Sequence, residues 1–167
     1  MNIPVRVEPC VGAPDSVEYT WDADTDILSA VVRAPESAER PKATAVELEG
    51  SDGSWLILDV RGGRIRGVEV AVWPDVKKRA DLTPPGEVED GTVIVGAVEQ
   101  GKRVAVEVNT HLQAEADRAE RTIHFRLGAN RETRTVRIAR DLLVDIDRRD
   151  RMAGVWLLGV PPFPDEP

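Results

Sequence analysis

The sequence predicts an all-β protein, mainly antiparallel and with little helix, in which two pseudo-repeated β-meander halves pack as a sandwich or barrel-like domain. Three observations predict it: short runs of alternating apolar and polar residues, turns rich in Gly, Pro and Asp, and a hairpin motif that occurs twice. The expected organisation is an N-terminal half over 1–81, a linker over 82–90, a C-terminal half over 91–161 and a loose tail over 162–167. At 167 residues, 41% of them hydrophobic, the halves are expected to form one globular unit.

The first half contains five predicted strands that are separated by short turns. The turns at 22–26, 51–54 and 62–63 have the Asp and Gly content of hairpin turns, and Pro74 ends the last strand. The five strands are predicted at residues 16–21, 27–34, 44–49, 55–60 and 65–73. A polar segment with several prolines, 75–90, then leads to the second half.

The second half contains six predicted strands, of which the second shows the longest alternation. Apolar residues and Thr110 occupy its even positions from 104 to 116, and mostly polar residues occupy the odd ones. A helix over 110–120 is the competing interpretation, because Thr110 begins a capping-box pattern and helix formers follow. We favour a strand, since the alternation continues into the next segment. The six strands are predicted at residues 92–99, 102–117, 122–127, 133–139, 142–146 and 153–160.

The repeated hairpin motif covers residues 58–74 and 144–161. In each copy an apolar strand ends in an aspartate, Asp59 or Asp145, and a turn leads to a glycine, Gly67 or Gly154. A second apolar strand and a closing proline follow. Because a half of about 75 residues is small for a stable core, two duplicated halves would bury the surface that each leaves exposed.

Two motifs of the first half carry a family resemblance. The first is Trp21-Asp22 followed by Asp26 and Leu28, and the second is Asp59-Val60-Arg61 followed by Gly67-Val68-Glu69-Val70. Together they resemble a bacterial family catalogued as domain of unknown function 2283, with Trp21 in place of a tyrosine and Arg61 in place of an aspartate. The resemblance covers about a third of the chain. It implies a fold and carries no established activity.

The second half departs further from this family. It keeps Asp145-Ile146-Asp147 and Gly154-Val155, but Trp156 replaces the family's glutamate. The best counterpart of its Trp-Asp motif is the segment 128–132.

The charge of the chain makes nucleic acid an unlikely partner. The formal net charge is −8, and residues 1–100 hold 10 Lys and Arg against 19 Asp and Glu, while residues 101–167 hold 12 against 11. Contacts with phosphate groups supply most of the affinity of a protein for nucleic acid, and an acidic chain disfavours these contacts. The arginines between Arg118 and Arg151 are interpreted as a solvated or charge-complemented surface, and an anion or nucleic-acid contact there is the alternative.

No segment predicts membrane insertion or export. No apolar run approaches the ~20 residues of a membrane helix, and the first residues lack an apolar signal region. The single cysteine, Cys10, excludes an internal disulfide and a CxxC site. A cytoplasmic protein without a cofactor is therefore expected.

Two weak metal candidates are present. Asp22, Asp24 and Asp26 alternate as at the start of a calcium loop, but a hairpin turn is the favoured interpretation because Ile27 and Arg33 occupy the positions of the required Gly and Glu. His111 and His124 are the only histidines. If 103–117 and 122–128 pair, one register puts His111 opposite His124, and the next puts Gln113 opposite His124. Solvated histidines are favoured over a zinc site.

The tryptophans are the best candidates for a binding surface. Trp55, Trp73 and Trp156 lie on the predicted strands that form the repeated hairpins, and Trp21 lies at the aspartate turn. A shared core with bonded indole N–H groups is the favoured interpretation, and an aromatic patch for a ligand or a second subunit is the alternative.

No catalytic motif is recognisable, and Gly62-Gly63 is a turn without the GK[ST] of a phosphate loop. The leading hypothesis is a non-enzymatic β module that binds a protein partner or forms homo-oligomers. The second is a small-molecule or metal-binding protein, with an enzyme as one form of it, that uses the acidic first half or the His111/His124 face. The third is the anion contact through the arginines.

Overall fold

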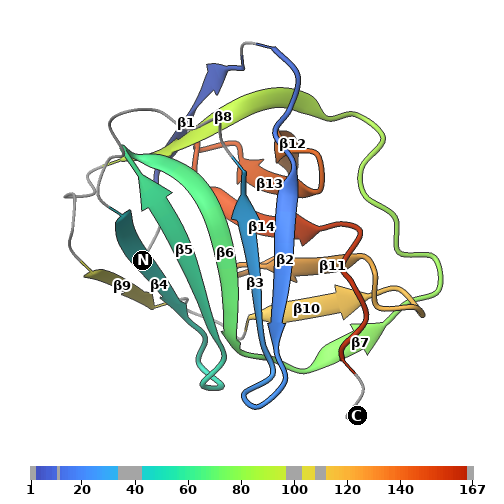
Figure 1. Ribbon diagram of the computed structural model, residues 1–167. Coiled ribbons are helices and arrows are strands. Elements are labelled where there is room, and N and C mark those ends of the chain that lie inside the picture. Colours follow the sequence, from blue (N-terminus) through green and yellow to red (C-terminus); the bar gives the residue numbers. More distant parts are fainter. Residues whose placement is uncertain (1–2, 11, 34–42, 97–102, 108–111, 165–167) are drawn as a thin grey trace.

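The computed structural model describes residues 3–10, 12–33, 43–96, 103–107 and 112–164 (Figure 1). Within them the chain is all β, as the sequence predicts, and contains no helix. No described helix is therefore available to span a membrane. The strands are β1 (Val5–Pro9), β2 (Val17–Asp22), β3 (Ile27–Val32), β4 (Ala43–Glu49), β5 (Trp55–Arg61), β6 (Arg64–Val72), β7 (Val76–Lys78), β8 (Glu89–Val95), β9 (Arg103–Glu107), β10 (Gln113–Ala116), β11 (Ile123–Arg126), β12 (Thr133–Ala139), β13 (Leu142–Asp147) and β14 (Met152–Leu157).

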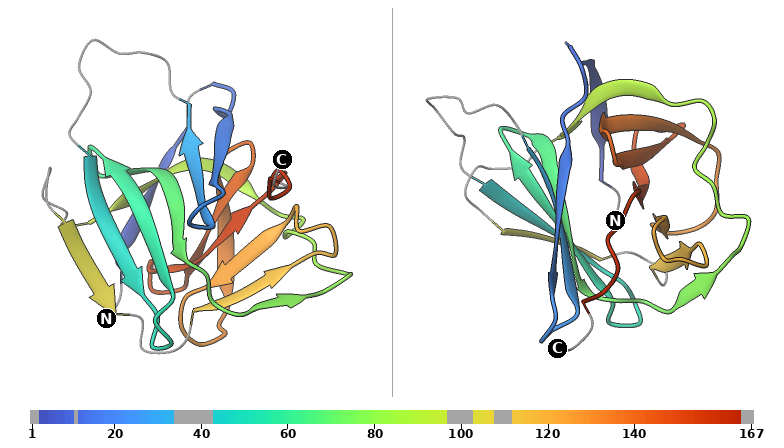
Figure 2. Two further views of the ribbon diagram at one scale, coloured as in Figure 1. Left: turned by 60° about the horizontal axis from the view of Figure 1, so that its bottom comes forward. Right: turned by 45° about the vertical axis from the view of Figure 1, so that its right-hand side comes forward.

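The strands form one continuous, curled sheet that contains two antiparallel segments of the same strand order. The first segment runs β2-β3-β6-β5-β4, and the second runs β10-β11-β14-β13-β12. Strand β8 joins them, pairing parallel with β12 and touching β6 by one residue pair. The two segments lie on opposite sides of the molecule (Figure 2, right). Each segment consists of a hairpin followed by a three-stranded meander whose last strand returns beside that hairpin.

The hairpins β5-β6 and β13-β14 share a local register. Asp59 lies opposite Gly67 in the first, and Asp145 lies opposite Gly154 in the second. In both, the register shifts at the residue after the aspartate, which marks a β-bulge. Both glycines are needed, because an added Cβ on either would lie under 3.0 Å from a carbonyl oxygen of the adjacent strand.

The main core is one cluster to which both segments contribute. Alternate residues of β3, β5 and β6 point inward and meet alternate residues of β10 and β11. Strands β13 and β14 are buried along their whole length on both faces. The largest fully buried side chains include Phe125, Leu28, Leu56, Leu142 and Leu157.

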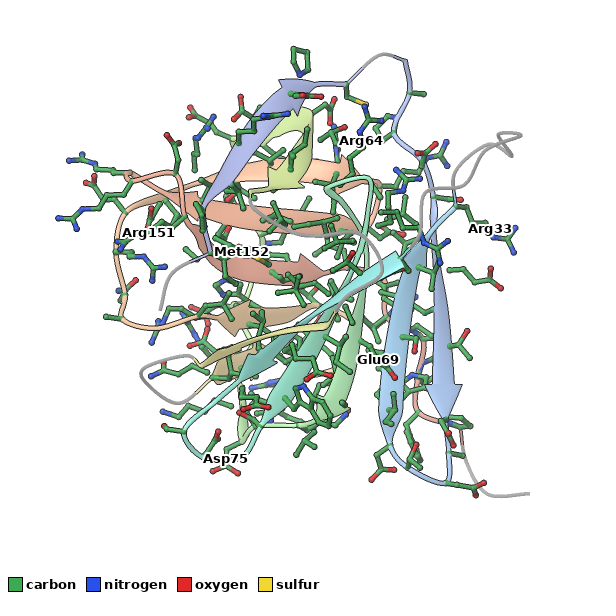
Figure 3. The ribbon with its side chains drawn as sticks, turned by 90° about the vertical axis from the view of Figure 1, so that its left-hand side faces the viewer. Arg33, Arg64, Glu69, Asp75, Arg151 and Met152 are labelled. Carbon is green, nitrogen blue, oxygen red and sulfur yellow. The ribbon has the colours of Figure 1, made fainter. Side chains whose placement is uncertain are left out.

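A second, smaller apolar cluster explains why the outer face of the second segment is also buried. Trp156 and Leu143 point outward there and pack against Leu82 of the 79–88 segment. In the first segment the position paired with Ile57 is Glu69 (Figure 3), whereas the position paired with Leu143 is Trp156. The charged Glu69 is partly exposed, and Trp156 is only 6% exposed. The tryptophan therefore occurs where the chain itself covers the sheet.

The prediction of a single strand over 102–117 is wrong, because two strands, β9 and β10, lie in this range. Strand β9 pairs parallel with β4 in the first segment, and β10 pairs with β11 in the second. A period-2 pattern is the same for one long strand and for two consecutive ones, so the alternation does not reveal the break. The alternative helix over 110–120 is also wrong in the part described, because β10 and a turn occupy 113–120.

Two strands have no counterpart in the sequence prediction. Strand β1 pairs with β8, and β7 pairs in parallel with β10 inside the polar 75–90 segment. Strand β1 alternates apolar Val5 and Val7 with charged Arg6 and Glu8, but it is short and ends at Pro9, and prolines are disfavoured within strands. The three residues of β7 are all exposed, so β7 shows no apolar alternation. The other observed strands fall close to the predicted ranges.

Candidate ligand-binding site

An aromatic cluster lies where the β2-β3 hairpin approaches the second segment. Trp21 of β2 and Trp73, which directly follows β6, stack with ring centroids 5.8 Å apart and an interplanar angle of 17°. Phe163 meets Trp21 edge-on with centroids 5.2 Å apart. Trp73 also lies 5.8 Å from Phe125 of the core, which anchors the cluster to the second segment.

Backbone acceptors fix both indole rings. The Nε1–H of Trp21 donates to the carbonyl oxygen of Pro161 at 2.9 Å, and that of Trp73 donates to the carbonyl oxygen of Asp26 at 2.7 Å. The indole donors are therefore satisfied by the protein itself. The polar edges of the rings are occupied, so a ligand would meet their apolar surfaces.

A cavity of about 460 Å³ adjoins this cluster, and β7 and the C-terminal segment contribute to its lining. Both of these elements lie near the lower end of the molecule in Figure 1. Its size lies in the range of ligand pockets, which are mostly apolar with a few polar groups. Only two lining side chains carry charge, Asp26 and Glu120. The lining residues are Trp21, Asp26, Trp73, Val76, Ala116, Ala119, Glu120, Ile123, Pro161, Pro162 and Phe163.

The two acidic groups differ in their surroundings. Glu120 forms an ion pair with Lys78 of β7 at 2.8 Å, and both side chains are more than half exposed. The Asp26 side chain has no ion pair or hydrogen bond within the described residues, and its backbone has a φ of 60° at the end of the β2-β3 turn. The cavity can thus bury an apolar group and accept hydrogen bonds at its rim.

Tyr19 holds β2 against the second segment beside the site. Its hydroxyl group lies 2.8 Å from the carbonyl oxygen of Leu158 and 3.0 Å from that of Asp141. Burial raises the pKa of the Tyr19 hydroxyl far above its ordinary value, and the nearby charge of Asp141 adds to the rise. The phenol is therefore a neutral donor that bridges the two segments.

The aspartate turn forms a hairpin connection. The Asp22 carboxylate accepts the backbone N–H of Asp24 at 3.0 Å, as in an Asx turn, and the N–H of Thr25 donates to the Asp22 carbonyl oxygen. Across the part of the chain that the structure describes, no three His, Cys, Asp or Glu side chains are placed to hold a metal ion. Of the turn's aspartates, only Asp26 lines the cavity.

Both registers predicted for the histidine-bearing hairpin are wrong. His124 of β11 lies opposite Glu115 of β10, so the ladder is displaced by two residues from the nearer prediction. The observed register still places the apolar residues of both strands on one face, as both predicted registers do, because Ala114 lies opposite Phe125 and Ala116 opposite Ile123. The extra displacement depends on where β10 begins, which the continuous alternation does not show. His111 lies outside the described residues.

His124 belongs to a compact polar cluster on the outer face of the second segment. Its Nε2 lies 2.8 Å from Oδ2 of Asp145, and its ring stacks on Trp156 with centroids 3.9 Å apart. Oδ1 of Asp145 accepts from Thr135 Oγ1 and from Trp156 Nε1. Both oxygens of this buried carboxylate are thus bonded, and the cluster orients Trp156 against Leu82.

The remaining tryptophan, Trp55, lies apart from the cavity at the start of β5. It is partly buried, and its Nε1 has no hydrogen-bond partner within the described residues. Of the four tryptophans proposed from the sequence as a binding surface, the structure brings Trp21 and Trp73 together at a cavity. Trp156 lies in a second apolar cluster, and Trp55 is separate.

Carboxylates neutralise much of the arginine-rich region between Arg118 and Arg151. The buried Asp147 accepts from Arg131 Nε at 2.9 Å and Arg151 Nε at 3.0 Å. Burial alone would raise the pKa of Asp147, but hydrogen bonds from Arg131, the Arg151 and Arg149 amides and the Arg151 side chain lower it below its usual range. Other ion pairs of this region are Arg134–Glu89, Arg137–Asp90 and Arg148–Glu132.

Several cavity residues escape sequence reasoning. Phe163 belongs to the segment marked as a tail, yet its ring packs on Trp21. The sequence Pro161-Pro162-Phe163-Pro164 could have indicated an ordered segment. Prolines restrict the backbone and so lower the conformational entropy that is lost when an extended segment becomes ordered. Ala119 and Glu120 carry no such signal, since small and charged residues in a turn are common.

No protein-family model matches the chain, and no curated protein sequence matches it.

Proposed function

We propose that this protein is a non-enzymatic binding module whose ligand occupies the aromatic cavity beside Trp21 and Trp73. The observation that carries the proposal is the stacked tryptophan pair at a cavity of about 460 Å³ between the two segments. Ligand sites favour such junctions and such apolar linings. This favours the small-molecule hypothesis over a protein partner.

The lining also supports binding over catalysis. It contains no Ser, Thr, Cys, His, Lys or Tyr, so no ordinary nucleophile or histidine base faces a bound ligand. The two carboxylates, Asp26 and Glu120, belong to exposed turns. The His124–Asp145 pair lies in a separate cluster whose packing partners differ from the cavity residues.

A fragment-binding experiment tests this proposal. Saturation-transfer NMR with a panel of water-soluble aromatic fragments, neutral, cationic and anionic, would compare the native protein with the Ala119→Phe variant. Ala119 lines the cavity and is exposed, so the larger ring should fill the cavity without disturbing the core. Ala129→Phe places the same ring at an exposed position that does not line the cavity.

The expected result is fragment binding that Ala119→Phe abolishes and Ala129→Phe preserves. Binding that both variants retain would place the ligand elsewhere, and absence of binding across the panel would overturn the proposal.

We also propose that the two segments arose by duplication of one β unit related to domain of unknown function 2283. Their common strand order and the paired Asp–Gly positions support this. The paired residues Ala116 and Ile123 are as far apart in sequence as the paired residues Trp21 and Leu28. Asp117, which follows Ala116, therefore corresponds to Asp22, which follows Trp21. This replaces 128–132, which lies between β11 and β12, as the counterpart of the Trp-Asp motif.

Self-association is a second candidate that one observation favours. Strand β2 pairs with β3 alone among the described strands, so its other edge is open to a further strand. Light scattering across a concentration series tests it: a mass that rises to a dimer supports association, and a constant monomer mass contradicts it.

A further inference from the structure

We infer that the cavity selects an organic cation, an alkylammonium group attached to an apolar body. This inference rests on the proposed function and adds the class of ligand. It follows from the inventory of hydrogen-bonding groups around the cavity, which is rich in acceptors and lacks free side-chain donors.

The lining offers a ligand no free side-chain hydrogen-bond donor. Trp21 and Trp73 carry the only N–H or O–H side-chain groups of the lining, and both donate to backbone oxygens. Pro161 and Pro162 have no backbone N–H at all. An anion or a carboxylate ligand would find no side-chain donor here, so its burial would be costly.

The acceptor side is well supplied. Asp26 and Glu120 place two carboxylates on the lining, and the aromatic rings present π surfaces. A cation is attracted to the face of an aromatic ring when it lies within about 6 Å of the ring centroid, and tryptophan attracts cations more strongly than tyrosine or phenylalanine. Because Lys78 partly neutralises Glu120, Asp26 is the main source of uncompensated charge on the lining.

The size of the cavity restricts the ligand further. A volume of about 460 Å³ exceeds what a single ammonium group fills, so the remaining space next to Ala116, Ile123 and Val76 accepts hydrocarbon. The inferred ligand therefore has a charged end near Asp26 and an apolar end toward these side chains.

Three molecules of nearly equal shape test the inference. Choline carries a trimethylammonium group, 3,3-dimethylbutan-1-ol replaces the nitrogen by carbon, and 3,3-dimethylbutanoate is the anionic analogue. Binding is measured by isothermal titration calorimetry at low and moderate salt. Choline is expected to bind at least tenfold more tightly than either analogue, and more weakly as salt increases.

A pair of variants isolates the charge of the lining. Asp26→Asn keeps the size and tolerates the positive φ, and should weaken choline binding about three- to fivefold while leaving the alcohol unchanged. Asp24→Asn removes a charge from the same turn at a residue outside the lining, and should have a smaller effect.

The outcomes separate this inference from the proposed function. Equal binding of choline and the alcohol, or tighter binding of the butanoate, would overturn the cation preference and leave a binding cavity. Fragment binding without any choline binding would also overturn it. If neither fragments nor choline bind, both the inference and the proposed function fail.

Discussion

Gly154 lies directly opposite Asp145 in the β13-β14 ladder, and a Cβ on this glycine would lie 2.8 Å from the Asp145 carboxylate and 2.6 Å from the Phe125 carbonyl oxygen. Gly67 has the equivalent place opposite Asp59, where a Cβ would lie 2.9 Å from the Ala30 carbonyl oxygen. The same close approach of strands therefore occurs in both segments.

The first prediction concerns these two glycines. Gly154→Ala should lower the free energy of unfolding by about 2–3 kcal/mol, because the new methyl group meets a backbone oxygen of the adjacent strand and a carboxylate that His124 already binds. Gly67→Ala should cost less, since its nearest contact is longer. Gly86→Ala is the control, as no atom lies within 4 Å of its added Cβ. Urea denaturation measures all three, and a neutral Gly154→Ala would contradict the described register.

The second prediction concerns the acid stability of the Asp147 cluster. Its pKa is lowered in the folded state, so its contribution is fully present above the unfolded pKa of about 3.9 and is lost as pH falls through the folded pKa. Asp147→Asn should lower the free energy of unfolding by about 2 kcal/mol at neutral pH. It should also flatten the dependence of stability on pH between about pH 5 and pH 2.

The control for the acid experiment is Asp90→Asn. Asp90 is exposed, and a hydrogen bond from Arg137 lowers its pKa against the opposing effect of desolvation. Solvent screens this pair, so the variant should change acid stability little. An Asp147→Asn variant as stable as the control at every pH would show that the two arginines contribute nothing.

The third prediction concerns Tyr19, the only tyrosine of the chain. Its phenol should not ionise near pH 10 while the protein is folded, because burial opposes the charge. The neutral phenol stabilises the folded state fully below the unfolded pKa of about 10, and this contribution is lost as pH rises above it. Absorbance at the phenolate band should therefore increase together with unfolding. A separate titration near pH 10 in the folded protein would contradict the buried position.

The fourth prediction concerns the cover on the second segment. Leu82→Ala should destabilise the protein by about 2 kcal/mol and shift tryptophan emission to the red, because it exposes Trp156. Val31→Ala removes an apolar side chain that is 48% exposed on the outer face of the first segment, and should change stability little. Equal effects of the two substitutions would show that the 79–88 segment does not protect its sheet.

Much of the β architecture is predictable from local pattern. Alternation and turn residues place most strands of both segments, and the Asp59 and Asp145 motifs mark hairpins that do share a register. The division into β9 and β10 is not predictable in this way, because residue alternation does not show which segment of the sheet a strand joins. Strand β7 is also not predictable from local pattern, because its residues are exposed and it pairs only with β10 at the edge of the sheet.

The candidate site was half predictable. Trp21 and Trp73 attract attention as large aromatic residues next to turns, and Asp26 belongs to a conspicuous acidic turn. These residues line one cavity with Glu120 and Phe163 only because of how the two segments pack. That packing cannot be predicted from short-range sequence patterns. Conversely, Trp55 and Trp156 look equivalent to the other two in sequence, and only tertiary structure separates them.

The central claim is that Trp21 and Trp73 form the wall of a site for organic cations, and the indole N–H resonances test it most directly. The chain has four tryptophans, so Trp55 and Trp156 serve as internal controls in one spectrum. Titration of ¹⁵N-labelled protein with choline should shift the Trp21 and Trp73 indole resonances in a saturable manner and leave the other two in place. Shifts confined to Trp55 or Trp156, or no saturable shift of any indole resonance, would contradict the claim.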